Sequence, residues 1–198
     1  MNGAFGPAKK QARKVNRRRF LGAASACPML ALGSARGRAP AGQEPHPALE
    51  LTAEDRVALA LMQFRRGFHC SQSVLETYAE DFGLEPETAR RMAAGLAGGS
   101  TVGGECGAVS AAYLILGLRH GRLMPAHGDV EKEAELFDRI RRFVEAFRSR
   151  HGTLNCRELL GVDVFTAEGR EEGLRRNLFA TKCPGFIRDA VTLLEELG

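Results

Sequence analysis

Apolar residues recur every three or four positions through most of residues 51–198, and no segment alternates strictly between apolar and polar. A period near 3.6 is typical of amphipathic helices, whereas strict alternation is typical of strands. Helices are therefore predicted over these segments: from 52 through 64, 71–82, 86 to about 98, 106–118, 129–150, a short one near 155, and a last one from 183. Residues 161–180 are interrupted by glycines and fit neither pattern. The predicted fold class is all-α, a compact bundle of about six to seven helices.

Local signals mark several of the expected helix ends. Thr52 and Asp55 form a start that resembles a capping box, with Asp in place of Glu or Gln. Gly83 is a C-terminal stop signal, and Pro86 suits the first turn of the next helix. The segment 106–118 is apolar on nearly every side, so we expect its helix to lie at the centre of the bundle.

Residues 1–41 differ from the rest of the chain in charge and pattern. They hold nine of the 28 Lys and Arg residues and no Asp or Glu, which leaves 19 basic against 24 acidic residues in the remainder. A basic segment precedes a short apolar run, 20–32, and the small residues Ala39-Pro-Ala41 follow, which is the layout of a cleaved signal peptide. The block NRRRFL at 16–21 resembles a twin-arginine signal, which directs already folded proteins to an export machinery.

These features predict a leader over 1–41, a linker over 42–50 and a single helical domain with four cysteines over 51–198. The domain is expected on the periplasmic or cell-envelope side of a bacterial membrane, without a stable membrane span, because the apolar run is too short for one. Cys27 is expected to be discarded with the leader, with lipidation at Cys27 as the alternative. Because the excess positive charge lies in the leader, we expect no nucleic-acid partner.

Four cysteines remain after the leader, at separations of 36, 50 and 27 residues: Cys70, Cys106, Cys156 and Cys183. No two of them form the C-x-x-C pair of thioredoxin-like sites or zinc knuckles, and no C-x-x-C-H haem-attachment motif is present. Each cysteine is expected at the start of a helix. Free N–H groups and the partial positive charge of a helix start stabilise a thiolate.

A glycine-rich loop precedes Cys106, and Gly103, Gly104 and Gly107 are expected to let the backbone approach a bound group closely. The residues alone leave three outcomes open for the four thiols. They share one cofactor site, they form two disulfides, or they are inert buried side chains, because cysteine is often buried without a further role.

Four blocks carry the cysteines in order: FHCSQSVL at 68–75, GECGAVSAAYLILGLRHG at 104–121, GTLNCRELLG at 152–161 and CPGFIRDA at 183–190. With these blocks, residues 51–198 resemble the C-GCAxxG-C-C family, whose members are regarded as redox-active. Glu105 and Ala111 depart from the motif, the second standing in place of a glycine. The resemblance implies an iron–sulfur cluster, most simply [2Fe–2S], with ligands Cys70, Cys106, Cys156 and Cys183, and no covalent haem.

The leading hypothesis is an exported electron-transfer or redox-sensing module, in which Gly103, Gly104 and Gly107 contribute to the cofactor site. The first alternative is a cofactor-free disulfide protein or thiol–disulfide exchanger, favoured by the even cysteine count and an oxidising compartment. The second is a structural zinc site, although such sites usually draw their ligands in close pairs. No arrangement of nucleophile and base argues for an enzyme. The redox partner protein is unknown, and a homo-oligomer stays open.

Overall fold

The computed structural model describes residues 51–121 and 130–197, all of which lie in the predicted domain. The expected leader, its cleavage site and the linker lie outside the described residues. Eight α-helices occur in this part of the chain: α1 Ala53–Arg65, α2 Cys70–Thr77, α3 Pro86–Ala94, α4 Gly107–His120, α5 Val130–His151, α6 Cys156–Leu160, α7 Ala167–Arg175 and α8 Leu178–Leu197. A 3₁₀ turn (η1, Glu80–Phe82) and a π-type turn (η2, Gly99–Gly103) complete them.

The predicted all-α fold class is confirmed, because these residues contain no strand. Their only bridge-type pairing is an isolated antiparallel bridge between Glu105 and Asn155. The helices number eight rather than six to seven, since α7 and the start of α8 occupy the segment 161–180, which had no predicted structure. Thr166 starts α7 by accepting a hydrogen bond from the Gly169 N–H at 3.0 Å.

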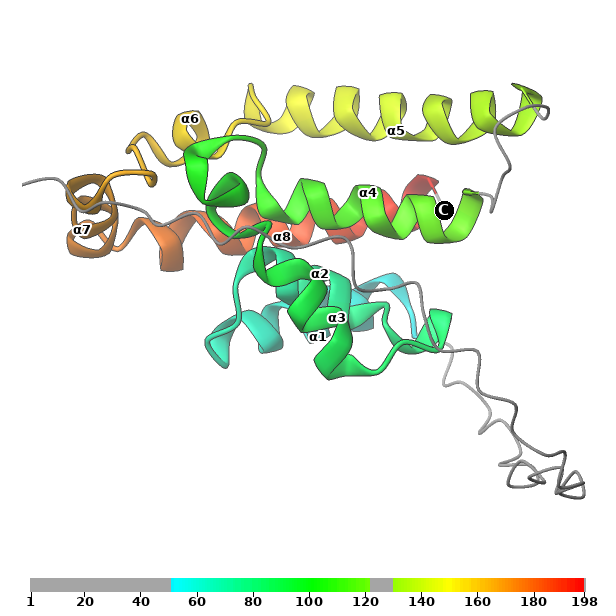
Figure 1. Ribbon diagram of the computed structural model, residues 1–198, viewed down its shortest axis with the longest axis horizontal. Helices are drawn as coiled ribbons and strands as arrows, with labels where there is room; N and C mark the ends of the chain where they lie inside the picture. The colour runs from blue at the N-terminus through cyan, green and yellow to red at the C-terminus, as the bar shows by residue number, and fades with distance from the viewer. Residues whose placement is uncertain (1–50, 122–129, 198) are drawn as a thin grey trace, which may run out of the picture. The chain divides into compact units, whose positions relative to one another are not determined.

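Helix α4 lies at the centre, as predicted. It contacts α2, α5 and α8, and its buried residues cover most of its circumference: Gly107, Ala108, Val109, Ala111, Ala112, Ile115 and Leu116. Ala111, which departs from the family motif, is fully buried, so its methyl group packs into the core. Figure 1 shows α5, α4 and α8 running alongside one another, with α1, α2 and α3 forming a second layer below them.

The segment 71–82 does not form one helix as predicted. Helix α2 ends at Thr77, whose hydroxyl donates a hydrogen bond to the Ser73 carbonyl at 2.9 Å, and the separate turn η1 follows. Hydroxyl groups that bond the preceding turn compete with regular helix hydrogen bonding. Gly83 ends η1 with a φ of 64°, which confirms the predicted stop signal. The third helix also ends earlier than predicted, at Ala94.

Three of the four cysteines lie at helix starts as predicted, and the prediction for Cys183 is wrong. Cys70 and Cys156 are the first residues of α2 and α6, and Cys106 is the N-cap of α4. Helix α8 begins at Leu178, so Cys183 lies in its second turn and Pro184 lies inside the helix. Pro184 removes only the hydrogen bond to the Ala180 carbonyl, and because Ala180 is exposed, water can replace that bond.

Tyr78 joins the C-terminal parts of α2, α4 and α8 to α1. Its fully buried ring lies between the guanidinium groups of Arg56 and Arg119, at 4.7 and 5.0 Å from the centroid. Its hydroxyl donates to Glu195 at 2.9 Å, and Arg119 pairs with the same carboxylate at 3.0 Å. Arg56 also pairs with Asp81 at 2.9 Å. We call these five residues the Tyr78 cluster.

Candidate cysteine redox site

Cys70 is positioned by contacts of α2 with α3 and with the glycine loop. The buried Ser71 hydroxyl donates to the Ala93 carbonyl at 2.8 Å, which fixes the first turn of α2 against α3. The backbone N–H groups of Ser71, Gly98 and Ala108 donate hydrogen bonds to the Cys70 sulfur. Gly98 reaches it with a φ of 61°, a conformation that glycine adopts without strain. The sulfur therefore lies among donors that favour its charged form.

The backbone places Cys106 next to Cys156. On either side of the isolated bridge, the Cys106 N–H donates to the Leu154 carbonyl at 2.8 Å, and the Cys156 N–H donates to the Gly104 carbonyl at 2.6 Å. Side chains two residues apart on paired segments point to the same face. Two cysteines that are 50 residues apart in sequence are thus held together by main-chain hydrogen bonds.

Asn155 starts the short helix α6 directly before Cys156. Its side-chain oxygen accepts hydrogen bonds from the N–H groups of Arg157 and Glu158, at 3.1 and 3.4 Å. At the other end of α6, the Lys182 ammonium donates to the carbonyls of Leu159 and Leu160, both at 3.1 Å. Because Lys182 precedes Cys183, this contact fixes α8 beside α6.

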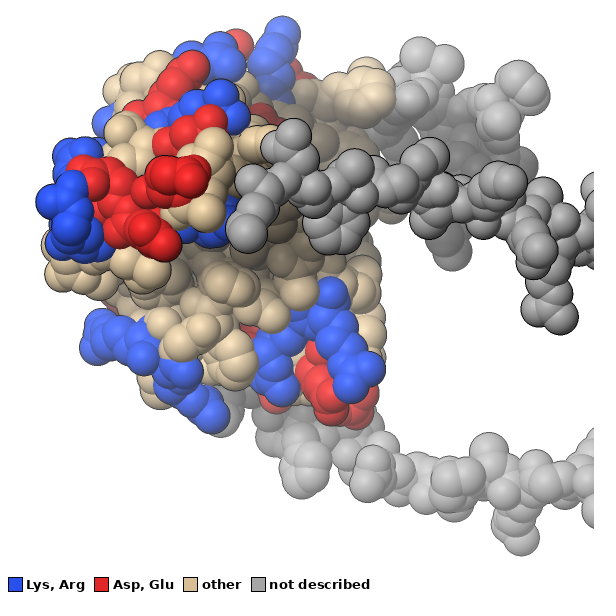
Figure 2. All heavy atoms as spheres, turned by 60° about the vertical axis from the view of Figure 1, so that its left-hand side comes forward, with Lys and Arg blue, Asp and Glu red and all other residues tan. Residues whose placement is uncertain are grey.

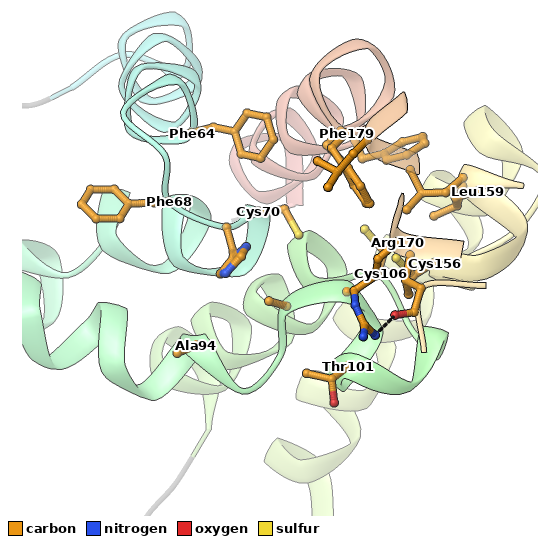
Figure 3. Close-up of a pocket in the computed structure, with 18 of the residues that line it drawn as sticks. Phe64, Phe68, Cys70, Ala94, Thr101, Cys106, Cys156, Leu159, Arg170 and Phe179 are labelled. Atoms are coloured by element: carbon orange, nitrogen blue, oxygen red, sulfur yellow. Dashed lines mark hydrogen bonds between the residues drawn. The ribbon is translucent and has the colours of Figure 1, made fainter. Parts of the chain in front are cut away.

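The four cysteines line one cavity of about 650 Å³. Each is at most 9% exposed, and none forms a disulfide. In Figure 3 the side chains of Cys70, Cys106 and Cys156 face a common space, with the rings of Phe64 and Phe179 on one side of it. The structure thus brings together all four predicted cysteines, including Cys183.

The two sulfurs of Cys70 and Cys106 are hydrogen bonded to each other. Donation from the Cys106 S–H, with the backbone donors, lowers the pKa of Cys70 to about 7 despite its burial. The same hydrogen bond, burial and the neighbouring Cys70 charge raise the pKa of Cys106 well above its usual value. In the metal-free chain one negative charge therefore forms first on this pair.

Cys156 and Cys183 behave differently because their burial dominates. Burial, followed by the charge on Cys70, raises the pKa of Cys156 to about 12 and raises that of Cys183 strongly. All four nevertheless line the same cavity. Within residues 51–121 and 130–197, no three Cys, His, Asp or Glu side chains form a group that could hold a single metal ion.

The three glycines predicted for the site have different positions. Gly107 lies directly under Cys70: a Cβ at this position would be 3.0 Å from the Cys70 sulfur and 2.7 Å from the Leu96 carbonyl oxygen. Gly104 accepts the hydrogen bond that positions Cys156, and Gly103, with a φ of 73°, packs against the Arg157 side chain. None of these three glycines is among the residues that line the cavity.

Sequence reasoning missed the remaining walls of the cavity. These are mainly apolar side chains from α1, α7 and α8, namely Phe64, Leu174, Phe179 and Phe186, together with Phe68, Arg170 and Thr101. In the sequence, Phe64 and Phe186 belong to ordinary apolar stripes, which look the same whether they pack against a neighbour or face a cavity. Thr101 gave no signal, because its φ of 65° depends on the folded loop.

Comparison with known families shows which family the chain belongs to. The family model described as "Putative redox-active protein (C_GCAxxG_C_C)" matches residues 68–197, which include all four cysteines. The chain belongs to this family. The predicted resemblance is thereby confirmed, and a redox-active role follows at the level of the C_GCAxxG_C_C family. No curated protein matches the chain, and no solved structure matches it. None of the described helices is long and apolar enough to cross a membrane.

Proposed function

We propose that the domain is an electron-transfer module that holds an iron–sulfur cluster, most simply [2Fe–2S], on Cys70, Cys106, Cys156 and Cys183. The observation that supports it most strongly is that four buried cysteines from four separate segments line one cavity. Iron–sulfur clusters are held by four thiolates, so the donor set fits this group. When bound, such a cluster supplies a one-electron redox couple.

The arrangement of the thiols favours a cluster over a single zinc ion. A tetrahedral zinc site needs four sulfurs about 2.3 Å from one centre. Here no three Cys, His, Asp or Glu side chains of the described residues form a group that could hold one metal ion. A cluster with two irons needs two pairs of sulfurs at separate positions. We assign Cys70 and Cys106 to one pair, because their sulfurs are hydrogen bonded, and Cys156 and Cys183 to the other, because the charge on Cys156 raises the pKa of Cys183.

The other residues of the site tune and shield the sulfurs. The N–H groups of Gly98 and Ala108 stabilise negative charge on the Cys70 sulfur, and hydrogen bonds to ligand sulfurs raise the reduction potential of such centres. Phe64 and Phe179 restrict the access of water to the sulfurs. The domain acts after export through the twin-arginine route, which the basic leader with its NRRRFL block supports.

A second candidate function is thiol–disulfide exchange, and the Cys70–Cys106 hydrogen bond favours it. In this reaction the Cys70 thiolate attacks a disulfide of a partner protein, and one partner sulfur leaves as a thiolate. Cys106 then gives its proton to that partner thiolate and attacks the Cys70 sulfur of the mixed disulfide, and the second partner sulfur leaves as a thiolate that takes a proton from water. The partner leaves as a dithiol, and a Cys70–Cys106 disulfide remains.

The test is to purify the full chain without oxygen and to record its visible absorption with its iron, sulfide and zinc content. We expect a brown protein with iron and acid-labile sulfide in equal amounts, both lost in Cys106→Ser. Cys27→Ser is the matched control, because it removes the only cysteine outside the domain and should leave both contents unchanged. A colourless, metal-free protein in which oxidation protects two thiols of the wild type, while the single Cys70 thiol left in Cys106→Ser stays reactive, would support thiol–disulfide exchange instead. Stoichiometric zinc without sulfide would also overturn the proposal.

A further inference from the structure

The cavity is larger than its four sulfurs and a cluster require. A four-atom Fe₂S₂ core occupies on the order of 100 Å³, if each atom takes about the 30 Å³ of a water molecule. The cavity measures about 650 Å³. Pockets of about 300–1,000 Å³ are typical of small-molecule sites. Most of the space beside the sulfurs is therefore left for a second occupant.

The walls of this remaining space are suited to a flat, apolar body. Phe64 of α1 and Phe179 of α8 contribute rings beside the sulfurs, and Phe68, in the turn before α2, lines the cavity with its ring directed away from them in Figure 3. The Phe68 ring is held in place by the Arg90 guanidinium at 5.0 Å from its centroid and by Arg66 at 6.0 Å. Leu174 lines the cavity and is nevertheless 69% exposed. Exposed apolar side chains at the margin of a cavity are typical of binding sites.

The surface around this end of the molecule has the same character. Figure 2 brings forward the end that carries α7, and it shows recessed uncharged surface between two groups of charged side chains. Phe165, next to α7, adds a large apolar side chain that is 60% exposed. An apolar patch with a polar margin at a cavity mouth indicates a ligand whose body is apolar.

Three residues with polar side chains line this apolar cavity: His69, Thr101 and Arg170. The Arg170 Nη1 group donates to the carbonyls of Val164 and Phe165, both at 2.9 Å, and no carboxylate of the described residues forms an ion pair with Arg170. Thr101 lines the same cavity, and its φ of 65° is strained for a β-branched residue. Such strain often accompanies a functional position. In Figure 3 Thr101 lies on the side of the cavity opposite Phe64.

We propose that the cavity binds a quinone, a flat apolar ring whose carbonyl oxygens accept hydrogen bonds, with its ring near Phe64 and Phe179 and one carbonyl facing Arg170. A long-chain fatty acid would satisfy Arg170, but the aromatic walls favour a ring. The choice of a redox-active ring rests on the proposed redox function, since the ligand lies beside the four sulfurs. The binding itself rests on the cavity and its donors, with or without a cluster.

The experiment uses the full chain, purified without oxygen, in its iron-loaded form and after iron removal by a chelator. The probe is tetramethyl-1,4-benzoquinone, whose fully substituted ring does not add thiols, and its Kd is measured by equilibrium dialysis. Comparison ligands are p-xylene, which lacks carbonyls, and decanoate, which is a fatty acid. The iron and sulfide contents of each sample are measured in parallel.

We expect the quinone to bind at least about tenfold more tightly than p-xylene, through hydrogen bonds that involve a charged donor. Arg170→Leu should weaken quinone binding by about tenfold and leave p-xylene binding unchanged. Ala94→Trp, which places a large ring at the cavity wall, should weaken both. Ala58→Trp is the matched control, because Ala58 is an exposed helix residue that does not line the cavity. It should change neither affinity. Circular dichroism confirms that each variant is folded.

Tighter binding of decanoate than of the quinone would overturn the proposal in favour of a fatty-acid site. Quinone binding that is insensitive to both Arg170→Leu and Ala94→Trp would overturn it as well. The two proposals fail independently. Quinone binding by a chain without iron and sulfide rejects the cluster alone, whereas an iron-loaded chain that does not bind the quinone rejects this inference alone.

Discussion

The Tyr78 cluster and the cysteine cavity lie at opposite ends of the same helices. Helices α2, α4 and α8 each carry a cysteine at or near their N-terminal end and a member of the Tyr78 cluster near their C-terminal end. In the Tyr78 cluster the ring faces two guanidinium groups and the hydroxyl donates to a carboxylate. In the cavity, four buried sulfurs share one mutual hydrogen bond and surround an open space.

The difference shows that the Tyr78 cluster stabilises the fold and that the cysteine cavity contributes less stability. Buried hydroxyl and carboxyl groups are costly without partners, and the Tyr78 cluster supplies partners from four helices. A thiol is a weak donor and a weak acceptor, so a buried sulfur can face a cavity at small cost. Cysteine side chains can therefore line a buried site in a helical bundle without a surrounding network of hydrogen-bond partners.

The largest expected effect comes from removing the centre of the Tyr78 cluster. Tyr78→Ala should lower the free energy of unfolding by about 3–5 kcal/mol, because it leaves a large buried cavity where the ring was packed. Tyr78→Phe, which loses only the hydrogen bond to Glu195, should cost about 1–3 kcal/mol. Urea denaturation measures both values. Thiol reactivity in the folded state should not change, and a change in Tyr78→Phe would show that the two ends are not independent.

A smaller loss of stability is expected from a substitution at Gly107, which lies where the cavity meets the core. In Gly107→Ala the new methyl group would lie 2.7 Å from the Leu96 carbonyl oxygen and 3.0 Å from the Cys70 sulfur. We expect a loss of about 1–3 kcal/mol in urea denaturation, as for other overpacked sites, with altered reactivity of Cys70. Gly117→Ala is the control in the same helix, because its new methyl group would meet no neighbouring atom within 4 Å. It should instead gain about 0.5–1 kcal/mol.

The smallest effect concerns pH. The pKa of Cys156 is about 12 in the folded chain against an ordinary value of 9.0, because its thiol is buried. A raised pKa means that the unfolded chain loses this proton first. The stability from the buried neutral thiol is thus complete below pH 9.0 and is lost as pH rises toward about 12.

Between about pH 8 and pH 10 the reduced, metal-free chain should lose about 1 kcal/mol through Cys156, at about 1.4 kcal/mol for each pKa unit. Urea denaturation of the wild type and of Cys156→Ser at the two pH values measures this difference. The variant should lose less stability than the wild type over the same interval. An equal loss in both proteins would show that the Cys156 thiol does not remain neutral.

The main features of the fold were predictable because they depend on local sequence. The apolar residues around α4 identified it as central, and Asn155 and the Thr52–Asp55 pair marked helix starts. The start of α8 was not predictable in the same way. The break before it depends on Asn177, whose φ is 54°, and Pro184 misleadingly resembled a first-turn residue.

The candidate site was predictable only in part. The four cysteines could be chosen as a group from their family-like blocks, and the structure brings them together. Their separation around a cavity could not be predicted, because it depends on how α6, α7 and α8 pack. Arg170 and Leu174 carried no signal in the sequence, since both lie in a segment whose helix was not recognised.

The pairing of residues 104–106 with 154–156 has a consequence for how this chain can change. Main-chain hydrogen bonds join the two segments, so the start of α4 and the residues that follow α5 are held side by side. An insertion or deletion between these two helices would change the length of the chain that joins them and would leave the pairing of 104–106 with 154–156 unchanged. That connection is therefore the natural place to graft a reporter or an affinity tag while Cys106 and Cys156 keep their spacing.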